Sequence, residues 1–222
     1  MSSVFDCRAR RLGDDVNTDY IISSARKRET IDAAVLKRYL LEAVNPAFAA
    51  SVQPGDVLVA GRNFGCGSAM EVAATVILAS GIRAVLAQSF ARAFFRNAIN
   101  NGLMPIEIDT SKIREGDRLE IRTPPAPRGL RAPAAPREDS ESGSGVGPRA
   151  WKRTSAGARA SGGGAPRALR EDGHVVVTVT VTVTVCDTGA TLTAPEWPPI
   201  VSDILGAGGL VPYLRREGRF RL

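Results

Sequence analysis

A glycine-rich stretch near the middle of the chain has the residue types and spacing of an anion-binding loop. Glycines stand at Gly61, Gly65 and Gly67, and the stretch connects a short apolar run to a predicted helix at 68–80. Glycines allow sharp turns and leave backbone N–H groups uncovered. The start of a helix adds partial positive charge. The loop therefore predicts a site for a small anion, such as a carboxylate or a phosphate.

The same loop carries two side chains that could be reactive. Ser68 with Glu71 matches a Ser-x-x-Glu capping box, so a structural role competes with a catalytic one. Cys66 could be activated by the helix start, although a buried structural cysteine is the default. It also stands where a Walker A loop would need lysine, and the glycine spacing does not fit a dinucleotide fingerprint. The one histidine, His174, lies far from Ser68 in sequence, which argues against a Ser-His-Asp hydrolase.

Strands and helices alternate around the loop. Apolar runs predict strands, and 3.6-residue periodicity with Gly or Asn endings predicts helices. The strand–helix–strand order favours an α/β fold with a parallel component and right-handed crossovers. The expected strands are 56–60, 83–87, 104–108, 118–122 and 175–185, the expected helices are 31–39, 68–80, 89–100 and 200–205, and 210–215 is expected to be a docked tail.

Composition indicates a globular protein with one domain. The 222 residues are 44% hydrophobic and 23% charged, without an apolar run long enough to span a membrane. The first residues, 1–11, lack the apolar region of a secretory signal. The three cysteines are scattered, which favours a reducing, cytoplasmic setting and argues against a metal site built by this chain alone. We expect a single domain over 1–222.

The positive charge is concentrated in one segment. Residues 123–172 hold nine Lys or Arg and five acids, which accounts for four of the six net positive charges of the chain. The segment is rich in Pro, Gly, Ala and Ser, and is predicted to be a low-complexity, disordered insertion. The remainder is nearly neutral and contains no base-reading element, so nucleic acid is not the expected partner.

Four blocks of the chain follow the order of one known family. They are Asn63–Ser68 with Glu71, then 13–22, parts of 81–106, and 203–214. These blocks resemble the small subunit of 3-isopropylmalate dehydratase, an aconitase-like swivel domain. The resemblance covers most of the chain outside 123–172. It implies a swivelling β/β/α fold, in which a mixed sheet or barrel is flanked by helices.

The resemblance also implies a mechanism shared between two subunits. A large partner subunit would carry a 4Fe-4S cluster on its own cysteines, and this chain would bind no metal. The open iron would act as a Lewis acid on a small dicarboxylic acid. Ser68 would be the catalytic residue, whose alkoxide takes the proton next to a carboxylate. The residues expected to contact substrate are Gly65, Cys66, Gly67, Met70, Arg26, Arg28, Thr18 and Asp19.

The chain departs from the family pattern directly after Ser68. The family reads Gly-Ser-Ser-Arg-Glu-His, whereas here Met70 replaces an arginine that would bind a substrate carboxylate. Arg26, Lys27 and Arg28 are the candidates to replace that cation, and a solvated charged face is the alternative. Methionine suits an alkyl group. The expected substrate is therefore a C-alkylated malate. The leading candidate is 3-isopropylmalate, which would place the protein in leucine biosynthesis, and the second is a methyl- or dimethyl-substituted malate. A diverged, non-catalytic subunit is the remaining alternative.

Overall fold

The computed structural model describes residues 3–123 and 181–218, and its centre is a seven-stranded mixed sheet. Across the sheet the strands follow the order β4-β3-β2-β1-β5-β6-β7. The strands are β1 (Ser3–Arg11), β2 (Asp56–Val59), β3 (Ala84–Ala87), β4 (Met104–Glu107), β5 (Arg118–Thr123), β6 (Thr182–Val185) and β7 (Ala190–Thr193).

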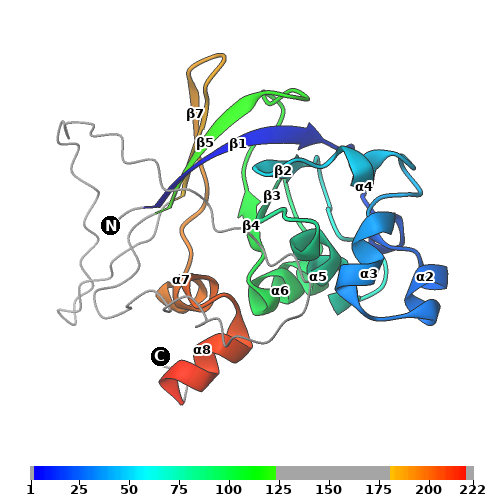
Figure 1. Ribbon diagram of the computed structural model, residues 1–222. Coiled ribbons are helices and arrows are strands. Elements are labelled where there is room, and N and C mark those ends of the chain that lie inside the picture. The colour runs from blue at the N-terminus through cyan, green and yellow to red at the C-terminus, as the bar shows by residue number, and fades with distance from the viewer. Residues whose placement is uncertain (1–2, 124–180, 219–222) are drawn as a thin grey trace, which may run out of the picture.

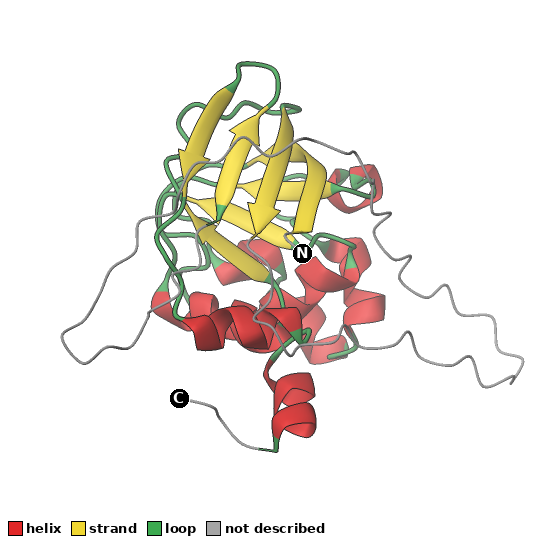
Figure 2. Ribbon diagram, turned by 90° about the vertical axis from the view of Figure 1, so that its left-hand side faces the viewer, coloured by secondary structure: helices red, strands yellow, loops and turns green. Residues whose placement is uncertain are grey.

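The sheet has a parallel half and an antiparallel half that meet at β1. Strands β1, β2, β3 and β4 pair in parallel, as the predicted strand–helix–strand order requires. Strands β1, β5, β6 and β7 pair antiparallel. The sheet curls into a half-barrel, and the helices gather on one side of it (Figure 1, Figure 2). This confirms the predicted mixed sheet flanked by helices.

Short helices cluster before the glycine-rich loop, and longer helices follow it. The short ones, α1 to α4 with the 3-10 helix η1, connect β1 to β2, whereas α5 and α6 are the crossovers of the parallel half. The helical elements are α1 (Thr18–Ile21), α2 (Ser24–Glu29), α3 (Ala33–Leu36), η1 (Lys37–Tyr39), α4 (Phe48–Ser51), α5 (Glu71–Ala79), α6 (Arg92–Asn101), α7 (Pro199–Gly206) and α8 (Leu210–Glu217).

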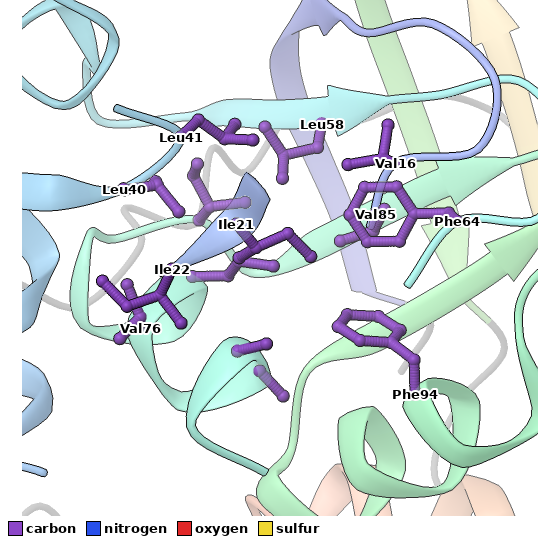
Figure 3. Close-up of a cluster of buried hydrophobic side chains, with 14 of the residues drawn as sticks. Val16, Ile21, Ile22, Leu40, Leu41, Leu58, Phe64, Val76, Val85 and Phe94 are labelled. Carbon is purple, nitrogen blue, oxygen red and sulfur yellow. The ribbon is translucent and has the colours of Figure 1, made fainter. Parts of the chain in front are cut away.

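Two hydrophobic clusters hold the layers together. One lies between the helices and the parallel half of the sheet, and it includes Phe64 from the loop, Phe94 from α6 and Val85 from β3 (Figure 3). The Phe64 and Phe94 rings pack edge to face with centroids 5.0 Å apart. The second cluster lines the other face of the sheet and includes Trp197 and the buried valines of β6. The glycine-rich loop is thus anchored in the core by its own phenylalanine.

The described residues differ from the sequence-based expectations in several elements. Strands β1 and β7 and the short helices α1, α2 and α4 were not predicted, and the helix expected at 31–39 is divided into α3 and η1. The segment 210–215, expected to be a docked tail, forms most of α8. This helix starts after Gly209, whose φ of +121° turns the chain, and Pro212 is tolerated because it lies in the first turn. Helix α5 begins at Glu71, three residues later than expected.

Part of the predicted organisation lies outside the described residues. The low-complexity segment 123–172 does so except for Thr123, which ends β5, and so does 175–180 of the valine–threonine strand. The described part of that strand, β6, is confirmed. The single-domain assignment stays a prediction. In the described ranges, none of the helices has the length and apolar character needed to cross a bilayer.

Candidate active site

The first half of the glycine-rich loop is tied down by hydrogen bonds. The backbone N–H of Phe64 donates to the Ser89 carbonyl at 3.0 Å, and that of Gly65 donates to the Val16 carbonyl at 2.8 Å. The N–H of Arg62 donates to a carboxylate oxygen of Asp14 at 2.8 Å, and this bond lowers the pKa of the Asp14 carboxyl. These groups are therefore unavailable to an anion. The expectation that the whole loop leaves its N–H groups uncovered is wrong for this half.

The second half of the loop is open. Gly67, Ser68 and Ala69 are exposed, and their backbone N–H groups have no hydrogen-bond acceptor among the described residues. The Ser68 hydroxyl likewise has no partner there. Helix α5 is capped by Met70 without any side-chain hydrogen bond, so the Ser68–Glu71 capping box does not form. Ser68 consequently presents a free hydroxyl at the surface, next to a helix start.

The Ser68 carbonyl explains why α5 starts late. It accepts a hydrogen bond from the Thr18 hydroxyl at 2.9 Å and another from the Met70 N–H at 2.8 Å. With both bonds in place, this carbonyl does not serve as the first acceptor of the helix ladder. Met70 therefore keeps an extended backbone, with φ of −100° and ψ of 110°, and the helix begins after it.

Thr18 contacts the loop from α1, whereas Asp19 contacts α2. Thr18 is buried, and its N–H donates to the Cys66 carbonyl at 2.8 Å, so its side chain is directed at the loop backbone. The Asp19 carboxylate accepts from the Ser24 hydroxyl at 2.6 Å, which links α1 to α2. Thr18 therefore braces the loop, Asp19 connects α1 to α2, and both remain only proposed substrate contacts.

Two glycines of the loop are required by close packing. Gly65 has a φ of +77°, and a Cβ there would lie 2.2 Å from the Phe94 ring. Gly67 has a φ of +90°, and a Cβ there would lie 2.4 Å from the Asn17 side-chain oxygen. These left-handed conformations favour glycine. Both glycines set the path of the backbone around Cys66 and Ser68.

The cysteines do not form a metal site in the part of the chain that is described. No group of three or more His, Cys, Asp or Glu side chains is close enough there to hold a metal ion. Burial, followed by the nearby Asp6 carboxylate, raises the pKa of the Cys7 thiol to about 12. Cys66 donates its thiol to the Asp15 carbonyl at 3.4 Å, and Cys186 is exposed elsewhere. These residues do not fit an iron–sulfur cluster.

The three basic residues of α2 have different surroundings. The Arg26 Nε lies 3.0 Å from a Glu42 oxygen, and this hydrogen bond raises the pKa of the arginine. The Arg26 guanidinium also lies over the Tyr39 ring, 4.0 Å from its centroid. Arg28 is exposed, and Lys27 places its Nζ 3.1 Å from the Met70 sulfur. Arg26 is thus already occupied by Glu42, which makes it a weak candidate for substrate binding.

Met70 lies beneath the open half of the loop. Its side chain is 5% exposed and belongs to the cluster between the helices and the sheet. The arginine that the family pattern has at this position is therefore replaced by a buried apolar side chain. Among the described residues, the sulfur of Met70 accepts a hydrogen bond from Lys27.

Comparison with known proteins places this site in a family. The model of the aconitase C-terminal domain matches residues 24–111, which include the loop and the helices on both sides of it. The chain is 34% identical to a 3-isopropylmalate dehydratase small subunit from Oleidesulfovibrio alaskensis, over 94% of this chain and 93% of that protein. It is 49% identical to a methanogen homoaconitase small subunit from Methanocaldococcus jannaschii, over 51% of this chain and 66% of that protein.

A solved structure supports the same assignment. The crystal structure of a 3-isopropylmalate dehydratase from Methanocaldococcus jannaschii matches with a TM-score of 0.67 and 30% identity, over 97% of this chain and 96% of that one. The fold and the loop together define a domain of the aconitase C-terminal class. Within that class, the chain belongs to the family of 3-isopropylmalate dehydratase small subunits.

One residue that shapes the site, Asn17, was not identified from the sequence. Asn17 accepts the Asp19 N–H at 2.9 Å as the cap of α1, and its side chain packs against Gly67. An Asn two residues before an acid is a helix-cap signal that could have been used. Its contact with the loop, 50 residues further along the chain, has no sequence signal.

Proposed function

We propose that this chain is the small subunit of a hydro-lyase that interconverts 2-isopropylmalate and 3-isopropylmalate in leucine biosynthesis. The observation that carries the proposal is the exposed Ser68 hydroxyl on a braced loop, in a chain that aligns along nearly its whole length with such small subunits. A large subunit is the partner that the relatives' names imply. A small dicarboxylic acid is the proposed substrate.

The proposed role of Ser68 is proton transfer at carbon. In the dehydration, the Ser68 alkoxide takes the proton from the carbon next to a carboxylate, and the C–H electrons form the C=C bond. The hydroxyl on the neighbouring carbon leaves as water after it takes one proton from a general acid of the assembled enzyme, and that acid is reprotonated by the water that adds in the rehydration. In the rehydration, the proton returns to carbon and water adds at the other position. The uncovered N–H groups of Gly67, Ser68 and Ala69, with the start of α5, stabilise negative charge at the open half of the loop.

The iron–sulfur chemistry is assigned to the partner. Because the described residues do not fit a cluster, we place the 4Fe-4S cluster on the large subunit, and no step of this chain is derived through it. The cluster supplies Lewis-acid binding of the substrate's oxygen atoms. This chain supplies the proton acceptor, and its loop orients that acceptor.

A related diacid is the second candidate substrate. Met70 places an apolar side chain under the loop, which suits a methyl- or dimethyl-substituted malate as well as the isopropyl compound. The cell compartment that we infer is the cytoplasm. A non-catalytic, partner-binding subunit is the alternative of a different class.

Reconstitution with a large subunit tests the proposal. Ser68→Ala is expected to lower kcat by about 10²- to 10⁴-fold while the subunits still assemble, because the group that takes the proton is lost. Ser111→Ala, at an exposed serine outside the loop, is the matched control and should retain full turnover. Both variants are assayed on 3-isopropylmalate and 2,3-dimethylmalate, with assembly followed by gel filtration. Unchanged turnover in Ser68→Ala, or wild-type turnover of neither diacid, would overturn the proposal.

A further inference from the structure

Two residues at the glycine-rich loop have a backbone conformation that normally favours glycine. Asp15 has a φ of +53° and Asn63 a φ of +58°. Residues with side chains rarely adopt such angles, although Asp and Asn tolerate them best. Both residues are exposed, whereas their chain neighbours Val16 and Phe64 are buried in the cluster between the helices and the sheet (Figure 3). Core packing of the side chain therefore does not hold Asp15 or Asn63 in this conformation.

The two strained residues are joined to each other. The side-chain amide of Asn63 donates to a carboxylate oxygen of Asp15 at 2.8 Å, across a separation of 48 residues in sequence. Among the described residues, this is the only hydrogen bond of the Asp15 side chain. Backbone strain persists where the surrounding structure holds it, and it is concentrated at functional sites. The paired side chains supply the contact that glycine at either position would lose.

Asp15 contacts the glycine-rich loop through three different groups. Its N–H donates to the Arg62 carbonyl at 2.8 Å, and its carboxylate accepts the bond from Asn63. Its carbonyl accepts the thiol of Cys66 at 3.4 Å. These partners extend from the start of the loop to the residue two positions before Ser68. A single residue of the preceding segment therefore holds the loop along most of its length.

The turn at Asp15 also sets where the following residues meet the loop. The positive φ changes the direction of the chain directly before Val16, whose carbonyl accepts the Gly65 N–H at 2.8 Å. Thr18 comes two residues later, and its hydroxyl donates to the Ser68 carbonyl at 2.9 Å. A change in the turn would move both of these partners together. The position of Ser68 therefore depends on Asp15, although no hydrogen bond joins the two among the described residues.

We propose that Asp15, held by Asn63, is a positioning residue that aligns the Ser68 hydroxyl with the reacting carbon of the substrate. The inference rests on the proposed dehydratase function, and it goes beyond that function by assigning a role in turnover to a residue that acts through the loop. A loop that is already ordered raises the rate because the reacting atoms need not be brought into place during the reaction. The effect of Asp15 therefore falls on kcat rather than on substrate binding.

Glycine substitutions separate positioning from stability. Asp15→Gly removes the hydrogen bond and also relieves the backbone strain, so its two effects on folding oppose each other. Asp15→Asn keeps an oxygen acceptor and tolerates the same φ. Asn63→Gly, alone and combined with Asp15→Gly, removes the bond from the other side. Glu196→Gly is the matched control, at an exposed acid between β7 and α7. The Tm is measured for each chain, and kcat and KM for 3-isopropylmalate are measured for each complex with the large subunit.

Asp15→Gly is expected to lower kcat by about 10- to 100-fold, with KM within about threefold and the Tm within about 3 °C of wild type. Asp15→Asn and Glu196→Gly should keep kcat within about threefold of wild type. The double variant should lose no more than Asp15→Gly alone, because the same bond is removed. Wild-type kcat in Asp15→Gly, a loss that Asp15→Asn does not restore, or losses that add in the double variant would refute the proposal.

Hydrogen–deuterium exchange of the full chain measures the order of the loop without reference to activity. Asp15→Gly should raise the exchange rates of the Phe64 and Gly65 N–H groups by about tenfold or more, while those of α6 stay unchanged. Equal rates in Asp15→Gly and wild type would refute the role of Asp15. If the wild-type complex turns over neither diacid, the proposed function fails, whereas the exchange comparison still decides whether Asp15 holds the loop.

Discussion

At the residue scale, the Thr18 hydroxyl holds the backbone of Ser68, the proposed catalytic residue. It donates to the Ser68 carbonyl at 2.9 Å from a side chain that is buried. A loop with several glycines has little stiffness of its own, so its position depends on such contacts. We therefore expect Thr18 to be a positioning residue, whose effect on turnover passes through Ser68.

Thr18→Val removes this hydroxyl and keeps the shape of the side chain. We expect the free energy of unfolding to fall by about 1 kcal/mol, because the bond to the Ser68 carbonyl is lost. We expect kcat to fall by about tenfold with little change in KM, because the reacting groups are misplaced. Thr18→Ser keeps the hydroxyl and should restore kcat. If the serine variant is as slow as the valine variant, packing rather than the hydrogen bond accounts for the loss.

Gly67→Ala tests how strictly the loop path is set. The new Cβ would meet the Asn17 oxygen at 2.4 Å in a residue with a φ of +90°. We expect a loss of about 2–4 kcal/mol in the free energy of unfolding, since backbone strain adds to the loss of the α1 cap. Denaturant unfolding of the purified chain measures it.

Gly116→Ala is the matched control for Gly67→Ala. Gly116 has a φ of +84°, but nothing lies within 4 Å of its added Cβ. It should therefore show the backbone strain alone, about 1–2 kcal/mol. Equal losses in the two variants would mean that the approach of Asn17 does not constrain the loop.

At the element scale, a buried carboxylate joins β1 to β2 on the parallel side of the sheet. Asp56, 1% exposed, lies 2.8 Å from Arg8 and 3.0 Å from Arg10, and it accepts the Gln53 N–H at 3.0 Å. Burial on its own would raise the pKa of Asp56, but the Arg8 hydrogen bond and the other donors outweigh it and lower the pKa below 3.8. Both arginines project from β1, so the carboxylate fixes the register of the two strands.

Asp56→Asn is expected to lower the free energy of unfolding by about 2–3 kcal/mol at pH 7, because Arg8 loses its counter-charge and Arg10 keeps only that of Glu115. The folded-state pKa of Asp56 is depressed, so its contribution is present above the unfolded-state pKa, near 3.8, and is lost as the pH falls through the folded-state value. The difference between wild type and variant should therefore shrink below about pH 4. Urea unfolding at pH 7, 5, 4 and 3 measures it. A difference that is constant with pH would rule out the ion pair as the cause.

The parallel half of the sheet was predictable because its strands are short apolar runs. All four residues of β2 and of β3 are buried, and glycines or asparagine mark the ends of the intervening helices. Strand β1 was missed because charged residues break up its apolar signal. Phe5, Cys7 and Ala9 alternate inward in β1, while Arg8 and Arg10 pair with a carboxylate that is distant in sequence.

The glycine-rich loop itself was predictable, but its surroundings were not. Glycine spacing and Ser68 are local features of the sequence. The bond from Thr18 and the approach of Lys27 to Met70 join residues about 40 to 50 positions apart. They follow from the packing of α1 and α2 against the loop, which no local pattern encodes. The late start of α5 has the same origin, since Thr18 occupies the carbonyl that a longer helix would use.

At the scale of the whole molecule, the segment 124–180 joins two strands that are already neighbours. In the antiparallel ladder of β5 with β6, Arg122 pairs with Thr182, so the chain leaves and re-enters the sheet at adjacent positions. Two strands in this arrangement can be joined by a two-residue turn such as Asn-Gly. The fold of the described residues therefore does not depend on a long connection between them.

Replacing 124–180 by Asn-Gly tests whether the segment serves the reaction. We expect the shortened chain to fold with a Tm within a few degrees of wild type. The β5–β6 pairing is kept, and the entropic cost of closing a loop is smaller for a shorter loop. With the large subunit, its KM and kcat should stay within about twofold of wild type, since Ser68, Thr18 and Lys27 all lie on the opposite, parallel side of β1. A scrambled segment of the same length is the control for spacing. A large fall in kcat for the shortened chain, with an unchanged Tm and restored only by the native segment, would show that residues 124–180 contribute to the active site or to the contact with the large subunit.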